Sequence, residues 1–201
     1  MSVIDLKYQL QCLTPSDIYE HLPTLYKYGK ECSRITECGV RSVVSSYAFA
    51  NALKGKTHNK LIQVDLCSND NVRNFGHECQ KENINRVFYE QSDLTCPIED
   101  TELLFIDTWH IYGHLKRELE RWNAHVSKYI ILHDTTVDEW AGESLRVGWD
   151  VHQQSKDTGI PIEEICKGLW PAVEEFLASH SEWTLHERFT NNNGLTVLKR
   201  V

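Results

Sequence analysis

Several features that define common protein classes are missing from this chain. No apolar run approaches the roughly 20 residues that a membrane-spanning helix needs, so we predict no membrane span. The N-terminus, MSVIDLKYQLQCLTPSD, has neither the basic start nor the long apolar core of a signal peptide. No repeat and no low-complexity tract is visible. These absences leave a soluble globular protein as the expectation.

A surplus of positive charge and a cysteine framework are missing too. The formal net charge is -8 at pH 7, whereas a nucleic-acid binder needs a basic surface, so we expect no nucleic-acid partner. The 7 cysteines are scattered and never spaced as C-x-x-C, which argues against structural zinc and against a disulfide framework. Free thiols are typical of a reducing compartment, and we therefore expect a cytoplasmic protein.

The length and composition suit one folded domain. The chain has 201 residues, of which 41% are hydrophobic and 25% are charged. We expect an N-terminal helical segment over residues 1–32 and a main domain over residues 33–201, together forming one compact unit. Four residues would set the helix boundaries of the first segment: Thr14 and Pro15 at a helix start, Pro23 at a break and Gly29 at a stop.

Strands and helices alternate along the rest of the chain. The expected strands cover residues 33–37, 60–66, 85–90, 103–107 and 128–133, followed by 183–189 and 194–201. The expected helices cover residues 43–53, 71–83 and 114–125, with further helical segments around 143–154 and 170–180. The stretch TNNNG between the last two strands is a turn signal. The pattern predicts an α/β, Rossmann-like fold with a seven-stranded, mostly parallel sheet, helices on both faces and a C-terminal antiparallel hairpin.

Polar residues stand where the first three strands end, which is where ligands bind in sheets of this kind. The first strand leads into ECGVRSVVSSY, which has a single glycine, Gly39, instead of the dinucleotide fingerprint G-x-G-x-x-G. Glu37 could receive an ammonium group, and the amides after Gly39 could meet a carboxylate at the helix start. The alternative is an ordinary strand-to-helix turn. The second strand ends at Asp65, which suits ribose hydroxyls, and the third leads to Ser92 and Asp93, which suit an adenine edge.

Two apolar runs, LLFIDTWHIYG and KYIILHDTT, end in acids and imidazoles. His133 is suited to act as a base near neutral pH, whereas Asp107 with Asp134 could instead hold Mg²⁺, with Asp138 or Glu139 nearby. Neighbours on a strand point to opposite faces, so His133 and Asp134 can face one ligand only if the strand has ended.

Each of these polar residues also has a purely structural explanation. His110 could cap the following helix, and Asp134 could cap its own turn. His114 and His125 would be solvated on a charged helix. Three tryptophans either line an acceptor site or pack in the core: Trp140, Trp149 and Trp170.

The segments ITECGVRSVVSSYAF, FYEQSD, LLFIDTWHIYGHLKREL and YIILHDTT resemble the class I S-adenosylmethionine-dependent methyltransferases. They look most like the branch with FID-x-x-H and HDT motifs, which includes sugar O-methyltransferases and relatives of the cephalosporin-hydroxylase group. The final segment ERFTNNNGLTVLKR resembles the last hairpin of such domains, including ones joined to glycosyltransferases in large viruses and bacteria.

The resemblance implies a role for individual residues of this sequence. The methionine end of the cofactor would lie against Glu37, Gly39, Val40, Arg41 and Ser42. The ribose would lie against Asp65, and the adenine against Ser92 and Asp93. The methyl group would lie near Asp107 and Trp109. The catalytic residues would be Asp107, His110 and His133, and the metal ligands Asp107 and Asp134. One departure is that Val43 and Ser45 replace glycines that the family often has in the first loop.

The function implied is S-adenosylmethionine-dependent O-methylation of a sugar hydroxyl, on a deoxyhexose such as rhamnose within a glycan, with or without Mg²⁺. Fusion to or association with a glycosyltransferase, assembly into a homo-oligomer and, for a viral protein, residence in the host cytoplasm are further expectations. Two alternatives stay open. One is a catalytically weak cofactor-binding or scaffold domain attached to a glycosyltransferase. The other is a nicotinamide-dependent oxidoreductase, against which the missing glycine fingerprint counts.

Overall fold

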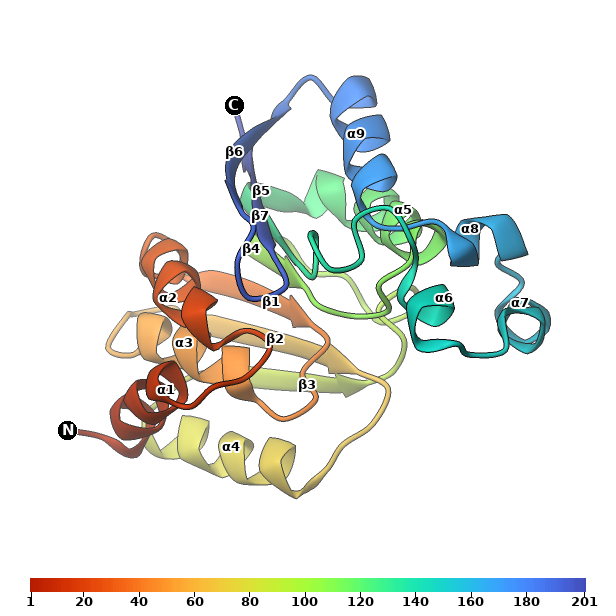
Figure 1. The fold of residues 1–201 in the computed structure, drawn as a ribbon. Coiled ribbons are helices and arrows are strands. Elements are labelled where there is room, and N and C mark those ends of the chain that lie inside the picture. Colours follow the sequence, from red (N-terminus) through yellow and green to blue (C-terminus); the bar gives the residue numbers. More distant parts are fainter.

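A seven-stranded sheet runs through the computed structural model, which describes residues 1–201 (Figure 1). The strand order is β3-β2-β1-β4-β5-β7-β6. The strands are β1 (Arg34–Cys38), β2 (Lys60–Asp65), β3 (Arg86–Glu90), β4 (Thr101–Ile106), β5 (Val126–His133), β6 (Trp183–Phe189) and β7 (Leu195–Arg200). The first five strands pair in parallel, and β7 runs antiparallel to both β5 and β6. The predicted mostly parallel sheet with a C-terminal antiparallel hairpin is confirmed.

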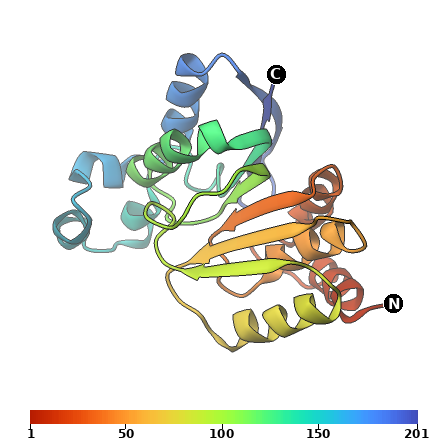
Figure 2. The ribbon, with the colours of Figure 1, turned by 180° about the vertical axis from the view of Figure 1, so that it is seen from behind.

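Helices cover both faces of this sheet (Figures 1 and 2). The helices are α1 (Val3–Leu13), α2 (Leu22–Lys30), α3 (Val44–Leu53), α4 (Asp70–Lys81), α5 (Tyr112–Trp122), α6 (Glu143–Val147), α7 (Val151–Thr158), α8 (Ile162–Cys166) and α9 (Trp170–Ser179), with two 3₁₀ turns, η1 (Tyr19–His21) and η2 (Asn123–His125). Side chains of α1 to α4 share one apolar cluster with the sheet, and those of α5 and α9 share the cluster on the other face. No helix combines the length and the apolar character needed to cross a bilayer.

The alternation of side chains along β4 explains the two clusters. Leu103 and Phe105 pack on the α1–α4 side, whereas Leu104 and Ile106 pack on the α5 and α9 side. All four are buried, as expected for a strand in the middle of a parallel sheet. A strand buried on both faces holds its polar successor, Asp107, at a well-defined position.

The N-terminal helices begin at residues other than those predicted. Helix α1 starts at a capping box formed by Ser2 and Asp5, and Thr14 is its C-terminal cap, so the prediction that Thr14 starts a helix was wrong. Pro15 follows the end of α1, where its ring cannot extend a helix. Helix α2 instead has Pro23 in its first turn, which is the position that tolerates proline.

Gly29 does not end α2, as the sequence had suggested, but lies inside it. A Cβ atom at this position would come 2.8 Å from the Cβ atom of Ala52 in α3. The glycine therefore serves the close packing of α2 on α3, a long-range contact that a local stop signal cannot reveal.

The segment between β5 and α9 also differs from the prediction. The single helical segment expected around residues 143–154 is two helices, because Gly148 takes a left-handed conformation (φ 79°) and ends α6. Helix α8 was not predicted. Helices α6, α7 and α8 lie together to one side of the sheet (Figure 1).

Candidate active site

The centre of the site lies at the carboxyl ends of β4 and β5. Asp107 directly follows β4, His133 is the last residue of β5, and Asp134 comes next. The Nδ1 atom of His133 is 3.1 Å from Oδ1 of Asp107 and 3.2 Å from Oδ2 of Asp134. Asp134 has a left-handed backbone (φ 57°), so the strand has ended and both neighbours face Asp107. The strand has therefore ended before Asp134, which is what the sequence required for His133 and Asp134 to face one ligand.

Four carboxylates surround the imidazole of His110. Its Nε2 atom lies 3.2 Å from Oδ1 of Asp107 and 3.1 Å from Oδ2 of Asp134. Its Nδ1 atom lies 3.5 Å from Oδ2 of Asp138 and 3.6 Å from Oε2 of Glu143. Burial alone would lower the pKa of His110, but the hydrogen bonds and charges of these acids raise it well above its usual value. His110 therefore belongs to the centre and does not cap α5, whose start has no side-chain cap.

His133 has hydrogen-bond acceptors on both sides of its ring. Its Nδ1 side faces Asp107 and Asp134, and its Nε2 atom lies 3.3 Å from the carbonyl oxygen of Asn192 in the β6–β7 turn. A ring with an acceptor at each nitrogen is held with both nitrogens protonated. Burial by itself lowers the pKa of His133, but the charges of and hydrogen bonds to the two aspartates raise it to about 10. This arrangement favours a positioning cation over the base predicted from the sequence.

The acids of the centre suit a divalent cation. Asp107, His110 and Asp134 each offer one ligand atom, and these atoms lie within 4.8 Å of one another. The Oδ1 atom of Asp134 is buried with no hydrogen-bond partner, which is costly for a carboxylate unless a cation compensates it. No backbone N–H group donates to the carboxylate of Asp134, so this residue does not cap its own turn. Asp138 also binds Arg146 through both oxygens, whereas Glu139 pairs with Arg188 away from His110.

The loop after β1 lies directly against Asp107. Gly39 has φ 84°, and a Cβ atom there would come 2.0 Å from the carbonyl oxygen of Asp107, so only glycine fits. Arg41 and Val43 also have positive φ values, 40° and 61°. Because left-handed backbone favours glycine, a β-branched residue such as Val43 is strained there. At positions 41 and 43 the loop therefore keeps a conformation suited to glycine, although neither residue is a glycine.

Glu37 points away from the open edge of the sheet. It is fully buried, and its two oxygens accept hydrogen bonds from Ser45 Oγ (2.6 Å), Ser46 Oγ (2.8 Å) and Gln63 Nε2 (2.5 Å). Burial raises the pKa of Glu37 to about 7, against the lowering effect of these hydrogen bonds. The geometry makes Glu37 an anchor for the start of α3, and its full burial separates it from the ammonium group expected from the sequence.

Asp65 is tied to the same loop. Its Oδ2 atom accepts hydrogen bonds from the backbone N–H groups of Val40 and Arg41, both at 2.8 Å, while Ser42 is exposed at the loop tip. The next residue, Leu66, is 71% exposed. A large apolar side chain open to solvent directly after the acid suits the flat face of an adenine. The role of Leu66 was not predicted from the sequence.

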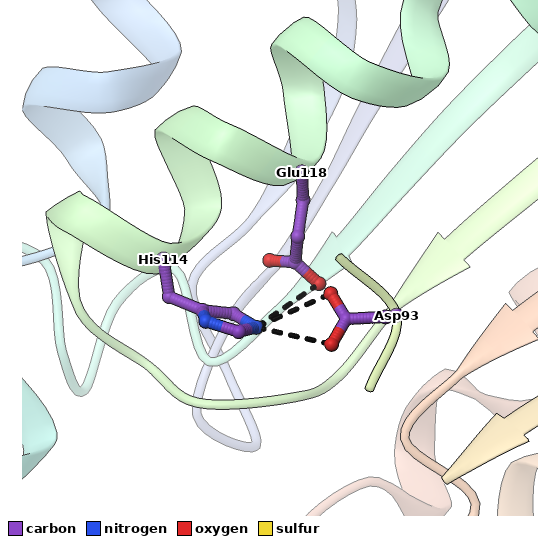
Figure 3. A group of neighbouring side chains, drawn as sticks. All are labelled: Asp93, His114 and Glu118. Carbon is purple, nitrogen blue, oxygen red and sulfur yellow. Dashed lines mark hydrogen bonds and ion pairs between the residues drawn. The ribbon is translucent and has the colours of Figure 1, made fainter. Parts of the chain in front are cut away.

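Ser92 and Asp93 follow β3, as predicted. The Oγ atom of Ser92 accepts a hydrogen bond from the backbone of Leu94 and shapes the loop. Asp93 is buried, and His114 Nε2 lies 3.2 Å from each of its two carboxylate oxygens (Figure 3). The expectation of a solvated His114 was wrong, because the residue lies on the buried side of α5.

Two other expectations of the sequence concern solvent exposure. The side chain of His125 is 42% exposed and pairs with Asp100. Trp170 is buried beneath the guanidinium group of Arg188, 3.5 Å from the ring centre. Trp140 and Trp149 are 62% and 47% exposed. Only the last two tryptophans are therefore open to an acceptor.

Trp109 turns toward α6 and α8. Its Nε1 atom donates a hydrogen bond to Oγ of Ser144 (3.0 Å), and its ring packs on a small cluster formed by Ile111, Ile160 and Ile165. Trp109 therefore links the loop after Asp107 to the helices beside the site. Its predicted contact with the cofactor stays a prediction.

No protein-family model and no curated protein matches this chain. Solved structures do resemble it in fold. A protein from Corynebacterium glutamicum has a TM-score of 0.66 at 13% identity, covering 100% of this chain and 91% of that chain. The O-methyltransferase TomG from Streptomyces achromogenes, involved in tomaymycin synthesis and solved with S-adenosylmethionine, has a TM-score of 0.61 at 12% identity, covering 100% and 91%. An O-methyltransferase from Bacillus cereus, solved with S-adenosylhomocysteine, has a TM-score of 0.57 at 11% identity, covering 98% and 90%. At these identities the likeness establishes the fold, which is the Rossmann-like fold of methyltransferases.

Proposed function

We propose that this chain is an S-adenosylmethionine-dependent O-methyltransferase that acts on a sugar hydroxyl. The observation that carries the proposal is the cluster of Asp107, His110 and Asp134 at the carboxyl edge of the sheet, directly against the loop of Gly39. Two solved proteins of the same fold hold S-adenosylmethionine or its product. In an open α/β sheet this edge is where a ligand binds.

The cofactor would lie across the ends of β1 to β4. The methionine end would contact the loop after β1, where Val40, Arg41 and Ser42 follow Gly39. The ribose would lie by Asp65. The adenine would lie between the exposed Leu66 and the loop of Ser92 and Asp93. The methyl group would then point toward Asp107, with Trp109 on the far side of that residue.

Methyl transfer to a hydroxyl forms an oxygen–carbon bond while the sulfonium–carbon bond breaks, and the hydroxyl proton must leave. His133 is a poor acceptor for this proton because both its ring nitrogens face acceptors. The acids around His110 raise its pKa in the same way, so without a metal it too is protonated. Mg²⁺ held by Asp107 and Asp134 would offset the charge of these acids and let His110, whose buried Nδ1 atom has no hydrogen-bond partner, act as the base. Asp107 and Asp134 would hold Mg²⁺, and His133 would keep their carboxylates in place. Bound Mg²⁺ lowers the pKa of a hydroxyl beside it.

The acceptor would approach from the side of α6 and α7. Trp140 and Trp149 are exposed there, and an aromatic ring suits the apolar face of a sugar. A deoxyhexose such as rhamnose, within a glycan, carries a methyl group where a hexose carries a hydroxymethyl group, so it offers more apolar surface to such a ring. The resemblance of the final hairpin to domains joined to glycosyltransferases supports a glycosyltransferase as partner or neighbour.

The remaining parts of the proposal concern organisation and compartment. Residues 1–32 would form a helical segment on the methyltransferase domain of residues 33–201, and copies would associate into a homo-oligomer. The compartment would be the cytoplasm, the host's in the case of a viral protein. All 7 cysteines are free thiols, which suits a reducing environment.

The test is turnover on a panel of glycans. The protein is incubated with S-adenosylmethionine, each glycan and Mg²⁺, and mass spectrometry follows the gain of one methyl group and the release of S-adenosylhomocysteine. We expect methylation of a deoxyhexose-containing glycan, and loss of activity with EDTA that added Mg²⁺ restores. Methylation of catechols or nucleic acid alone would contradict the acceptor, and activity that survives EDTA would contradict the metal.

Substitutions at the centre extend this test. His110→Asn and Asp107→Asn should each lower turnover by about 10²–10⁴, the range typical for loss of a base or of its positioning. Asp100→Asn is the matched control, because the side chain of Asp100 is 89% exposed and pairs with His125, away from the centre. Near-full turnover in both site variants would place the chemistry elsewhere.

A further inference from the structure

A second cluster of ionisable side chains shares no residue with the centre of the candidate active site. It joins Asp93, in the loop after β3, to His114 and Glu118, one helical turn apart on α5 (Figure 3). The three residues are 7%, 9% and 0% exposed, respectively. Two separate segments of the chain therefore bring two carboxylates and an imidazole together away from water.

The protein does not balance the charge of this cluster. His114 is the only basic side chain that pairs with either carboxylate, and no lysine or arginine side chain lies within ion-pair distance of Asp93 or Glu118. Arg121 donates to the backbone carbonyl oxygens of Asp93 and Cys96 and not to a carboxylate. One imidazole beside two buried acids leaves a shortage of positive charge, which is costly away from water. A bound cation would remove this shortage.

Glu118 also carries an oxygen that the protein leaves unsatisfied. Its Oε1 atom accepts a hydrogen bond from Thr108 Oγ1 at 2.8 Å, whereas its Oε2 atom is buried and has no hydrogen-bond partner. Figure 3 shows the carboxylate of Glu118 turned toward His114 and Asp93. Burial, together with the charge of Asp93, raises the pKa of Glu118 well above its usual value. A fully buried carboxylate that points into the cluster with a free oxygen indicates a missing ligand.

The spacing of the three side chains fits a single metal ion. The Nε2 atom of His114 lies 3.2 Å from each carboxylate oxygen of Asp93 and 3.9 Å from Oε1 of Glu118. One ligand atom from each residue lies within 4.8 Å of the other two. Zn²⁺ binds nitrogen and oxygen at about 2.0–2.2 Å, so two ligands of a tetrahedral ion are roughly 3.3–3.6 Å apart. The observed separations are close to this spacing.

The donor set distinguishes between divalent ions. Imidazole nitrogen suits Zn²⁺, whereas Mg²⁺ prefers oxygen ligands and retains several waters. Residues four apart on a helix lie on the same face, which lets His114 and Glu118 reach one ion together. Three protein ligands leave the fourth tetrahedral position for a water molecule.

We propose that Asp93, His114 and Glu118 form a second metal site, which takes a divalent ion of the Zn²⁺ type and fastens the loop after β3 to helix α5. This site is separate from the Mg²⁺ centre proposed above, and its ion takes no part in methyl transfer. Thr108, which binds Glu118, directly follows Asp107. The ion therefore stabilises the loops after β3 and β4 at the same edge of the sheet.

The experiment titrates the full chain with Zn²⁺ alone by isothermal titration calorimetry, after treatment with EDTA and removal of the chelator. The background protein carries Cys67→Ser, because Cys67 is the only exposed thiol, and Asp107→Asn with Asp134→Asn, which remove the ligands proposed for Mg²⁺. We expect this protein to bind one equivalent of Zn²⁺. Its thermal unfolding midpoint should rise with Zn²⁺, because the folded state alone contains the site.

Matched substitutions in this background identify the ligands. His114→Gln and Glu118→Gln each remove one ligand with little change of shape. Loss of a group that only supports a ligand typically weakens metal binding by about 10–100-fold, so we expect at least about 100-fold for these two variants and about 10–100-fold for Thr108→Val. His125→Gln and Glu120→Gln remove a partly exposed imidazole and an exposed acid nearby in the sequence, and should leave the affinity unchanged.

Thermal unfolding without Zn²⁺ reports whether each variant is folded, and Glu118→Gln alone carries the test if His114→Gln does not fold. Zn²⁺ affinity that Glu118→Gln leaves unchanged would overturn the proposal. A background protein that binds no Zn²⁺, although the chain with Asp107 and Asp134 intact does, would place the only metal at the candidate active site and would overturn it as well.

Discussion

Glu37 shows how a single buried acid links the site to stability. Its folded-state pKa is raised from 4.5 to about 7, chiefly by burial. Between these pH values the folded protein binds more protons than the unfolded chain, so the contribution of Glu37 to stability falls as pH rises through this window. The full loss is on the order of 3 kcal/mol.

Glu37→Gln removes this titration while keeping the shape of the side chain. The amide can accept hydrogen bonds from Gln63 and Ser46 and donate to Ser45, whose hydroxyl can also accept. We expect the unfolding free energy of the variant, relative to the wild type, to increase between pH 4.5 and pH 8, as measured by urea denaturation at several pH values. Glu120→Gln, at an exposed position, is the control. A relative free energy that stays flat with pH would show that Glu37 is ionised in the folded protein.

At the level of residues, the sequence predicted which residues lie at the site better than it predicted the directions of their side chains. Asp107, His133 and Asp134 were predicted to meet because their strands end side by side, and they do. The orientation of Glu37 was not predictable, because it depends on hydrogen bonds from Ser45 and Ser46 in helix α3. The burial of His114 could have been suspected, since it precedes the apolar stripe of α5. A sequence shows which residues reach an edge, but not which way each side chain turns.

The loop after β1 is the element on which the geometry of the centre depends. Gly39 and Gly55 both have left-handed backbone, with φ values of 84° and 75°. A Cβ atom at Gly55 would meet nothing within 4 Å, whereas one at Gly39 would collide with the carbonyl oxygen of Asp107. The two positions therefore separate backbone strain from a steric clash.

Gly39→Ala and Gly55→Ala form a matched pair for this distinction. We expect Gly55→Ala to lower the unfolding free energy by about 1–2 kcal/mol, the cost of left-handed backbone alone. Gly39→Ala should cost about 1–3 kcal/mol more, as overpacking does, and should also weaken S-adenosylhomocysteine binding because the loop must move away from Asp107. Denaturant titration and calorimetry measure the two effects. Equal losses of stability in the two variants would mean that the loop yields freely and does not position Asp107.

Among the elements, the regular ones were predictable and the irregular ones were not. Strand β2 follows a clear apolar pattern, and the predicted bounds of β6 agree with the structure. The break between α6 and α7 depends on Gly148, and the place of Gly29 inside α2 depends on its contact with Ala52. The first is a local signal that could have been used, whereas the second requires knowledge of which helices touch.

At the scale of the whole molecule, the β6–β7 turn joins distant parts of the chain at the site. Asn192 receives a hydrogen bond from the backbone of Glu20 and donates one to the carbonyl of Ser16. The carbonyl oxygen of Asn192 faces His133, and that of the next residue, Asn193, accepts two backbone hydrogen bonds from the segment after β5. The N-terminal segment is thereby tied to the end of the sheet where the candidate site lies. No local pattern predicts such a contact, because its partners are more than 100 residues apart.

The central claim is that this sheet edge binds S-adenosylmethionine. Calorimetric titration of the intact protein with S-adenosylhomocysteine and, separately, with NAD tests it most directly, and Asp65→Asn tests the place of the ribose. The account predicts saturable binding of S-adenosylhomocysteine, weaker binding in the variant and none of NAD. Binding of NAD without S-adenosylhomocysteine would contradict the account and favour an oxidoreductase on the same sheet.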